Sequence, residues 1–368
     1  MREFEHTGIL QVSAAVYNHY GIKTNYPVDK DVDGWLKNNS FRCVVVCLLD
    51  AMGAQILRDY LPKEAFFNQY LAKTTSTVFP PTTTAATTAL LTGKSPKENG
   101  WLGWSQYFKE VDDVVIPFLE KGNYNKNMYP NLIQNVIPTK LIYDELKEKG
   151  IGATSIGPSF DHNHPCKNYP CFLDEIVKIS HNQKTQFTYA YWDDPDHTMH
   201  THGPSSSKVN ELLTQMDQET GEFVKRLDSD VGILFLADHG QIDVEHYDLK
   251  QDKELCDCFE KAPSIEPRAL TFFLKKDRKE EFVELFNKKL GKYFELLTKE
   301  EVITSNLFGY NQAHPRFVGF LGDMMAIAID KMELDYGGTL KLKGNHAGSL
   351  PEEMEIPLIM YPSNDAKR

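Results

Sequence analysis

Runs of apolar residues alternate with amphipathic segments along much of the chain. Continuous apolar runs cover Arg42–Asp50 and Val231–Ala237, and β-forming residues dominate Thr185–Trp192. Such runs are typical of strands that are buried on both faces of a parallel sheet. Between them, helical spacing of apolar residues recurs over Thr139–Gly150 and Ser206–Leu227. The alternation predicts an α/β fold with a mostly parallel central sheet flanked by helices.

Residues 251–329 show a different pattern, in which short strands and charged helices mix. The segment contains two strand candidates and two helix candidates, which are Ala269–Lys275, Asp323–Asp330, Lys279–Gly291 and Glu300–Phe308. This pattern predicts a small inserted α+β subdomain. We therefore expect residues 1–250 and 330–368 to form the core and residues 251–329 to form the insert.

Composition and charge narrow the class of protein. The 368 residues are 41% hydrophobic and 25% charged, which is an ordinary globular mixture. The net charge of −12 argues against binding to a nucleic-acid polymer, which requires a basic surface. No apolar run is long enough for a membrane span, and the first residues lack a signal pattern. We expect a cytoplasmic protein whose six cysteines are reduced thiols.

Acidic side chains follow three of the predicted strands. Asp50 ends the first strand, Asp196 lies just beyond the second and Asp238 directly follows the third. Acids at strand ends are often only turn formers or helix caps. Here, however, two histidines accompany them, since His200 shares a helical face with Asp196 and His239 follows Asp238. Carboxylates with imidazoles are natural zinc ligands, and strand ends are where open α/β sheets bind ligands.

The segment STVFPPTTTAATTALLTG, residues 76–93, contains a run of threonines at a predicted helix start. Two prolines suit the entry to a helix, and Thr82, Thr83 and Thr84 follow them at or near the N-cap. One interpretation is ordinary threonine capping. The other is a nucleophile, because the free N–H groups and dipole of a helix N-terminus favour an anion such as phosphate.

In combination these motifs resemble the alkaline phosphatase superfamily, and most of all its nucleotide pyrophosphatase/phosphodiesterase branch. The pattern consists of a strand-end Asp, a Thr or Ser nine residues before a T-G pair, D-x-x-x-H, D-H-G and a late G-x-H, and it runs from Asp50 to His346. Counting back from the T-G pair at residues 92–93 reaches Thr83, with Thr82 and Thr84 as alternatives. The resemblance implies an alkaline phosphatase-like catalytic core, with the insert at residues 251–329 as a cap over the site.

The resemblance also implies two divalent metal ions, with zinc as the expected metal. By position, the ligands would be Asp196, His200 and His346 in one set, and Asp50, Asp238, His239 and Thr83 in the other. It further implies a two-metal hydrolase of phosphate diesters or pyrophosphates that forms a covalent phospho-threonine at Thr83. The partner is then a small-molecule phosphate ester.

One position departs from the branch, which usually has an Asn 21 residues after the nucleophile. Here that position is Trp104, close to Trp101. The two tryptophans are interpreted either as core packing or as an aromatic wall for the leaving group. Lys94 is the nearest basic residue, and this shortage of positive charge favours diesters. The alternatives are a phosphomonoesterase or a phosphonate hydrolase on the same metals, or a relative that only binds metal or phosphate.

Overall fold

The computed structural model describes residues 7–337 and 341–362. Its central sheet has seven strands, in the order β2 (Leu71–Ser76), β18 (Glu355–Tyr361), β9 (Val231–Leu236), β1 (Cys43–Leu49), β8 (Phe187–Trp192), β6 (Ala153–Pro158) and β7 (Pro165–Cys166). Strand β1 is parallel to β8 and β9, and β6 is parallel to β7 and β8, whereas β18 is antiparallel to its neighbours. The predicted α/β class with a mostly parallel sheet is confirmed.

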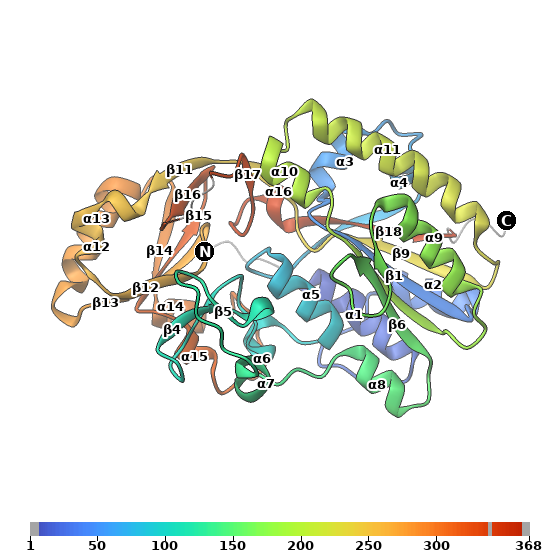
Figure 1. The fold of residues 1–368 in the computed structure, drawn as a ribbon, viewed down its shortest axis with the longest axis horizontal. Helices are drawn as coiled ribbons and strands as arrows, with labels where there is room; N and C mark the ends of the chain where they lie inside the picture. Colours follow the sequence, from blue (N-terminus) through green and yellow to red (C-terminus); the bar gives the residue numbers. More distant parts are fainter. Residues whose placement is uncertain (1–6, 338–340, 363–368) are drawn as a thin grey trace.

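Helices cover the central sheet, which lies on the right in Figure 1. In one group of helices, α1 (Gly8–His19) contacts both α2 (Lys30–Asn39) and α5 (Thr83–Thr92). A second group contains α3 (Ala54–Tyr60), α4 (Phe66–Gln69), α9 (Tyr169–Ser180), α10 (Asp196–His202) and α11 (Ser207–Phe223). All seven residues of β1 are buried between the layers, as expected for a strand covered on both faces.

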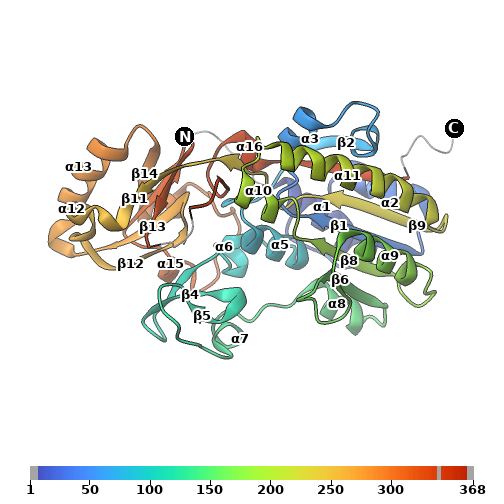
Figure 2. The same cartoon turned by 45° about the horizontal axis from the view of Figure 1, so that its top comes forward.

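A second lobe, residues 245–337, lies at the other end of the molecule in both cartoon views (Figures 1 and 2). Its antiparallel sheet has the order β12 (Phe259–Glu266), β13 (Ala269–Leu274), β15 (Met324–Ala328) and β14 (Phe294–Thr298). Helices α12 (Lys253–Cys256), α13 (Lys279–Leu290), α14 (Lys299–Thr304) and α15 (Phe317–Phe320) accompany it. Phe272, Phe282 and Phe286 are among the residues of its own apolar core.

Smaller elements lie around and between the two sheets. A three-stranded sheet consists of β3 (Gln106–Phe108), β4 (Asp113–Ile116) and β5 (Lys121–Gly122). Two further pairs are β10 (Ile242–Asp243) with β17 (Gly344–Asn345), and β11 (Glu245–Asp248) with β16 (Met332–Asp335). Short helices are α6 (Pro96–Asn99), α7 (Leu132–Val136), α8 (Ile142–Glu148) and α16 (Pro351–Met354). The division at residues 251 and 329 stays a prediction.

Two predicted helices are shorter in the structure than their apolar spacing suggests. Helix α8 begins at Ile142 rather than at Thr139, because the Asp144 carboxylate accepts a hydrogen bond from the Leu141 amide (3.0 Å) and caps the helix there. Helix α14 ends at Thr304, and Asn306 takes a left-handed conformation (φ 56°) that interrupts the predicted continuation. Local polar chemistry therefore decides both boundaries.

A buried ion pair joins the second lobe to the core. The Arg268 guanidinium, between β12 and β13, donates to both carboxylate oxygens of Glu353 in α16 (2.7 and 2.9 Å), and both side chains are fully buried. The Gly348 amide donates to the same carboxylate (2.7 Å). Paired, bidentate geometry is what makes such buried charges tolerable. The pair thereby fixes the loop that follows His346 against the second lobe.

The structure also addresses two expectations from composition. No helix in the described ranges has the length and apolar character needed to cross a membrane. All six cysteines lie in those ranges as free thiols.

Candidate active site

Three neighbouring strands bring the predicted site residues to one edge of the central sheet. In the pairing of β1 with β8, Leu49 lies beside Trp192, and the Asp50 amide donates to the Trp192 carbonyl oxygen (2.9 Å). Helix α10 begins just after β8, and Asp238 directly follows β9 on the other side of β1. Because all three strands are parallel, these motifs meet at the carboxyl edge of the sheet.

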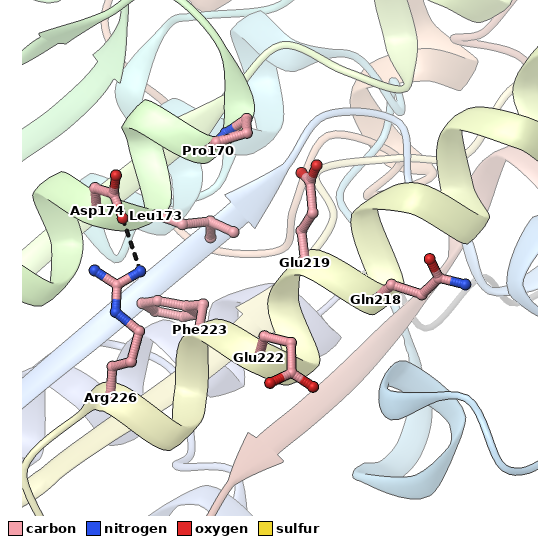
Figure 3. A pocket seen from close by; sticks show the side chains of 8 residues that line it. All are labelled: Pro170, Leu173, Asp174, Gln218, Glu219, Glu222, Phe223 and Arg226. Carbon is pink, nitrogen blue, oxygen red and sulfur yellow. Dashed lines mark hydrogen bonds and ion pairs between the residues drawn. The ribbon is translucent and has the colours of Figure 1, made fainter.

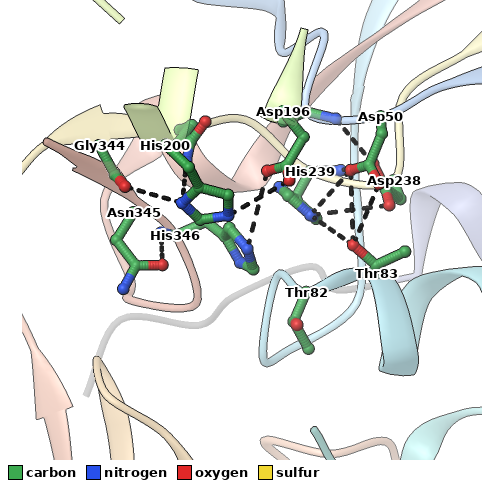
Figure 4. Close-up of polar contacts among 12 residues, drawn as sticks. Asp50, Thr82, Thr83, Asp196, His200, Asp238, His239, Gly344, Asn345 and His346 are labelled. Atoms are coloured by element: carbon green, nitrogen blue, oxygen red, sulfur yellow. Dashed lines mark hydrogen bonds and ion pairs between the residues drawn. The ribbon is translucent and has the colours of Figure 1, made fainter. Parts of the chain in front are cut away.

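Asp196, His200 and His346 form the first cluster of potential metal ligands (Figure 4). One turn of α10 separates Asp196 from His200, and His200 Nε2 lies 3.2 Å from Asp196 Oδ2. The loop after β17 brings His346 Nε2 to 3.9 Å from Asp196 Oδ1. One ligand atom from each residue falls within 4.8 Å of the others. The structure thus brings together the three residues of the first predicted ligand set.

The second cluster includes Asp50, His239 and Asp196, again with ligand atoms within 4.8 Å of one another. His239 Nε2 lies 3.4 Å from Asp50 Oδ1 and 3.6 Å from Asp238 Oδ2. Asp238 Oδ1 is occupied by the amides of Ala51 and His239, both at 3.0 Å. Asp238 therefore presents only Oδ2 toward this cluster, while Asp196 belongs to both clusters.

All three histidines of these clusters are oriented in the same way through Nδ1. Each Nδ1 lies 2.8–3.0 Å from a backbone carbonyl oxygen, with the pairs His200–Gly344, His239–Gly240 and His346–Pro81. A carbonyl only accepts, so Nδ1 of His239 and of His346 carries the proton and their Nε2 atoms keep a lone pair. The Nδ1 of His200 lies between the Gly344 carbonyl and the Gln241 amide nitrogen, each at 2.8 Å. Such hydrogen bonds are the usual means of orienting metal-binding histidines.

The side chains of the two clusters fit divalent metal ions. Asp196 Oδ1 and Asp238 Oδ2 are buried and have no hydrogen-bond partner among the described residues. An unpartnered buried carboxylate oxygen is costly. Cations held between these oxygens and the Nε2 atoms of the three histidines would remove that cost, and a donor set of nitrogen and oxygen suits zinc or a similar ion.

The pKa shifts of these groups come from burial and from the charges of their neighbours. Burial raises the pKa of Asp50 well above its usual value, and the carboxylates of Asp238 and Asp196 add to the rise. For Asp196 burial also acts upward, but His200 outweighs it and the pKa falls to about 2. Burial and the neighbouring His239 lower the pKa of His346, which keeps its ring neutral. A ligand histidine must be neutral.

Thr83 is the hydroxyl that faces the second cluster. Its Oγ1 lies 3.2 Å from His239 Nε2 and 3.4 Å from both oxygens of Asp50, at the first position of α5. The hydroxyl of Thr82 is instead bound to Glu266 (2.6 Å). Thr84 is fully buried. Of the three threonines, Thr83 alone is in hydrogen-bond contact with the predicted ligands among the described residues.

A cavity of about 500 Å³ adjoins this cluster. We define its floor as Thr83, Asp196, His200 and His346, and its wall as Trp104, Tyr124, Glu266 and Tyr336. The wall contains one buried acid, Glu266, which is only 4% exposed. Its Oε1 accepts hydrogen bonds from the Thr82 hydroxyl and from the Trp104 amide, each at 2.6 Å. Burial raises the pKa of Glu266 to about 7.

The two tryptophans singled out in the sequence have different environments. Trp104 is 43% exposed and lines the cavity. Trp101 is only 9% exposed, stacks at a tilt on Phe118 and donates its indole N–H to Thr139 Oγ1 (2.8 Å). It belongs to an apolar core beside the second lobe. The role of both residues in substrate binding stays a prediction.

A second hollow, of about 340 Å³, lies between α9 and α11 (Figure 3). Its lining includes Leu173 and Phe223 together with the ion pair between Arg226 and Asp174 (2.7 Å). None of the residues that line it belongs to the predicted motifs. The chemistry predicted from the sequence therefore lies in the first cavity.

Several polar residues of the site had not been singled out from the sequence. Tyr191 donates to Asp50 Oδ2, and Gln241 lies 2.8 Å from His200 Nδ1. Asn345 accepts from the His346 amide (2.9 Å) and donates to Glu333 (2.6 Å). Gln241 and Asn345 stand inside or beside the quoted D-H-G and G-x-H motifs, which could have revealed them.

The fold and this site define a metal-dependent hydrolase of phosphoric esters, of the alkaline phosphatase superfamily. Residues 44–348 match the model of the type I phosphodiesterase / nucleotide pyrophosphatase family, and the chain belongs to that family. This match confirms the resemblance seen in the sequence. No curated protein sequence matches the chain significantly.

Solved structures share the fold at low sequence identity. Human ectonucleotide pyrophosphatase / phosphodiesterase 5 superposes with a TM-score of 0.65 at 16% identity, over 86% of this chain and 87% of that one. The murine protein gives a TM-score of 0.63 at 16% identity, with the same coverage. Phosphonoacetate hydrolase from Sinorhizobium meliloti 1021, in complex with phosphonoacetate, gives 0.64 at 13% identity over 87% and 90% of the chains.

Proposed function

We propose that the chain hydrolyses phosphate diesters or pyrophosphates, with Thr83 as the nucleophile. The observation that carries the proposal is the position of Thr83 Oγ1, 3.2 Å from His239 Nε2 and 3.4 Å from the Asp50 carboxylate. A hydroxyl at the start of a ten-residue helix also has free backbone N–H groups beside it, and these suit the phosphate oxygens of a substrate.

The chemistry at Thr83 is a double displacement. Its Oγ1 forms a bond to phosphorus while the bond from phosphorus to one alcohol breaks, and the hydroxyl proton is balanced by protonation of the leaving alkoxide. Water then hydrolyses the phospho-threonine and restores the hydroxyl. The burial of Asp50 and His239 excludes bulk water around the nucleophile and keeps it aligned.

The metal ligands would be divided as the sequence predicts. Asp196, His200 and His346 would hold one ion, and Asp50, Asp238, His239 and Thr83 the other, with zinc as the proposed metal. When bound, such ions supply Lewis-acid charge that favours an ionised hydroxyl and stabilises charge on phosphate oxygens. The chain's own contribution is to orient the histidines through Nδ1 and to keep His346 neutral.

A second candidate is hydrolysis of phosphonates or monoesters at the same site. It is supported by the structural likeness to phosphonoacetate hydrolase. Against monoesters, the described residues that line the cavity include neither lysine nor arginine. A monoester carries more negative charge than a diester and would gain from such residues. An inactive threonine-to-alanine variant of the murine relative, in complex with AMP, makes nucleotide esters suitable first substrates to test.

The test compares two isosteric variants of neighbouring threonines. Thr83→Val removes the proposed nucleophile, and we expect kcat on bis(p-nitrophenyl) phosphate to fall by at least about a thousandfold. The zinc content measured by plasma emission spectroscopy should stay close to that of wild type. Thr84→Val is the matched control, because the Thr84 hydroxyl is buried and has no partner in the described structure.

Full activity of the Thr83→Val variant would refute Thr83 as nucleophile. Loss of activity in both variants, with correct folding by circular dichroism, would also count against an individual role for Thr83.

We further propose a cytoplasmic location. Its test is cell fractionation with immunodetection, and recovery of the protein outside the cytoplasm would contradict it.

A further inference from the structure

Two of the six cysteines lie side by side at the edge of the central sheet, and we call Cys166 and Cys171 the edge pair. Cys166 ends the edge strand β7, and Cys171 lies in the first turn of α9, which packs against β6, β7 and β8. The Cys166 thiol is in hydrogen-bond contact with the Cys171 thiol, and both side chains belong to one apolar cluster. Such contact brings the two sulfur atoms close, which is the first geometric requirement for a disulfide.

The two thiols of the edge pair differ in their access to solvent. Cys166 is only 2% exposed, whereas Cys171 is partly exposed. Burial raises the pKa of the Cys166 thiol to about 12, and the contact with Cys171 adds to the rise. A reagent from solvent therefore meets Cys171 first, while Cys166 stays protonated until its partner has reacted.

The local backbone holds both cysteines in place. The Cys171 amide donates to the Asn168 side chain (3.0 Å), which caps α9, and the Cys166 sulfur lies 3.7 Å from the His164 carbonyl oxygen. The edge strand itself has a short pairing, because β7 meets β6 only at Cys166 and the residue before it. A bond between the two cysteines would fasten this edge to α9.

The other four cysteines have different surroundings. Cys256 donates its thiol to the Leu249 carbonyl oxygen (3.1 Å), and Cys258 donates to a backbone carbonyl oxygen of α12 (3.5 Å). The remaining two cysteines are fully buried within β1, in the middle of the central sheet. The edge pair thus combines a partly exposed thiol with a second thiol in contact with it.

We propose that the edge pair is a reversible oxidation site that exchanges with small-molecule disulfides. The Cys171 thiolate attacks one sulfur of the incoming disulfide, forms a mixed disulfide and releases the other half. Cys166 then gives up its proton, and its sulfur displaces the second half and closes the bond to Cys171. Two electrons pass to the small disulfide, which takes up the two protons and leaves as two thiols. The site is separate from the cavity and does not depend on the proposed function.

A direct test is possible because Lys167 lies between the two cysteines. Trypsin cleaves after lysine, so it separates Cys166, in peptide 150–167, from Cys171, in peptide 168–178. The folded wild-type protein is incubated with glutathione disulfide, alkylated, denatured and digested. We expect mass spectrometry to show these two peptides joined and the free thiols to fall by two per chain. Dithiothreitol should reverse both changes.

Single variants separate the two roles. Cys166→Ser should keep a mixed disulfide between Cys171 and glutathione, because no second thiol is present to displace it. Cys171→Ser should leave Cys166 unmodified, because that thiol is buried. Cys256→Ser removes a partly exposed cysteine outside the edge pair, and as the matched control it should form the joined peptides as wild type does.

The inference is overturned if folded wild-type protein gives no joined peptides, or gives them only when it is denatured before oxidation. It is equally overturned if Cys171 becomes joined to other cysteines as often as to Cys166. Circular dichroism of the reduced variants checks their folding. Should a serine variant fail to fold, the peptides of the wild-type protein still decide the question.

Discussion

The floor of the cavity consists of residues from short sequence motifs, whereas Tyr124, Glu266 and Tyr336 in its wall belong to no motif. On the floor, each histidine has its Nδ1 fixed by a backbone carbonyl. In the wall, Glu266 is held only through Oε1, and Trp104 and Tyr124 are partly exposed. We therefore expect the floor to perform the same chemistry on every substrate and the wall to contact the parts that differ between substrates. Changes to the floor should affect every substrate equally, and changes to the wall should affect substrates selectively.

The largest expected effect is the loss of a floor ligand. His200→Ala removes one of three ligands from the first cluster, so we expect the metal content to fall by about one ion per chain. Values of kcat/KM should drop at least about a thousandfold on diesters and monoesters alike. His202→Ala, on the same helix but exposed, is the control. Unchanged metal content by plasma emission spectroscopy would remove His200 from the ligand set.

The second effect concerns the buried acid of the wall in metal-free protein. Glu266 has a raised pKa of about 7 in the folded chain, against a usual value near 4.5. Below pH 4.5 the acid is protonated in both states. Between pH 4.5 and 7 the unfolded chain loses its proton first, so folding stability falls as pH rises, by about 3 kcal/mol from this group.

Glu266→Gln should therefore flatten the decline in the free energy of unfolding between pH 5 and 8, measured by urea titration in a chelating buffer. Glu260→Gln, at an exposed position of the same strand, is the control. A variant whose pH dependence equals that of wild type would show that Glu266 is not responsible. The measurement therefore tests whether burial of Glu266 in the wall lowers the free energy of unfolding.

A third prediction concerns the hydrogen bonds that connect the second lobe to the floor. Glu333 in β16 holds Asn345, which in turn holds the His346 amide. Glu333→Ala should weaken zinc affinity about tenfold, as measured by chelator competition, because residues that orient ligands contribute that much. Excess zinc should restore kcat. Glu355→Ala, in a surface ion pair with Arg58, is the control, and a loss of kcat that excess zinc cannot restore would contradict a positioning role.

The smallest effect is expected at the exposed indole of the wall. Trp104→Leu should raise KM for bis(p-nitrophenyl) phosphate about tenfold and change kcat by less than about threefold, because a packing contact acts on bound substrate and transition state alike. Methyl p-nitrophenyl phosphate, with a smaller second arm, should show a smaller rise. A fall in kcat with constant KM would place Trp104 in the catalytic step instead.

Sequence alone was sufficient for the parts of the molecule whose signals are local. The buried strands and the residues that follow them could be predicted because apolar runs and strand-end acids are contiguous in the chain. The strand predicted over Arg42–Asp50 corresponds to β1, Cys43–Leu49, and Asp50 follows it. The two side chains in contact with the Thr83 hydroxyl, Asp50 and His239, are likewise among the predicted ligands.

The wall could not be predicted in the same way. Glu266 lies at the end of an ordinary antiparallel strand, and its partner Thr82 is 184 positions away. Tyr124 and Tyr336 are in contact across a similar separation and belong to no motif. Long-range packing of the second lobe decides which of its residues enter the cavity, and no local pattern records that choice. The helix ends at Ile142 and Thr304 differ from expectation for a smaller reason, because capping overrides apolar spacing.

Asp196 belongs to both ligand clusters, and this has a thermodynamic consequence. A carboxylate that would hold one ion and lies within 4.8 Å of ligands of the other would make the two occupancies interdependent, because filling one site would change the affinity of the other by some factor. Linkage requires that the factor be the same in either order of binding. The two sites would then behave as one cooperative unit, whose titration with metal cannot be described by two independent dissociation constants.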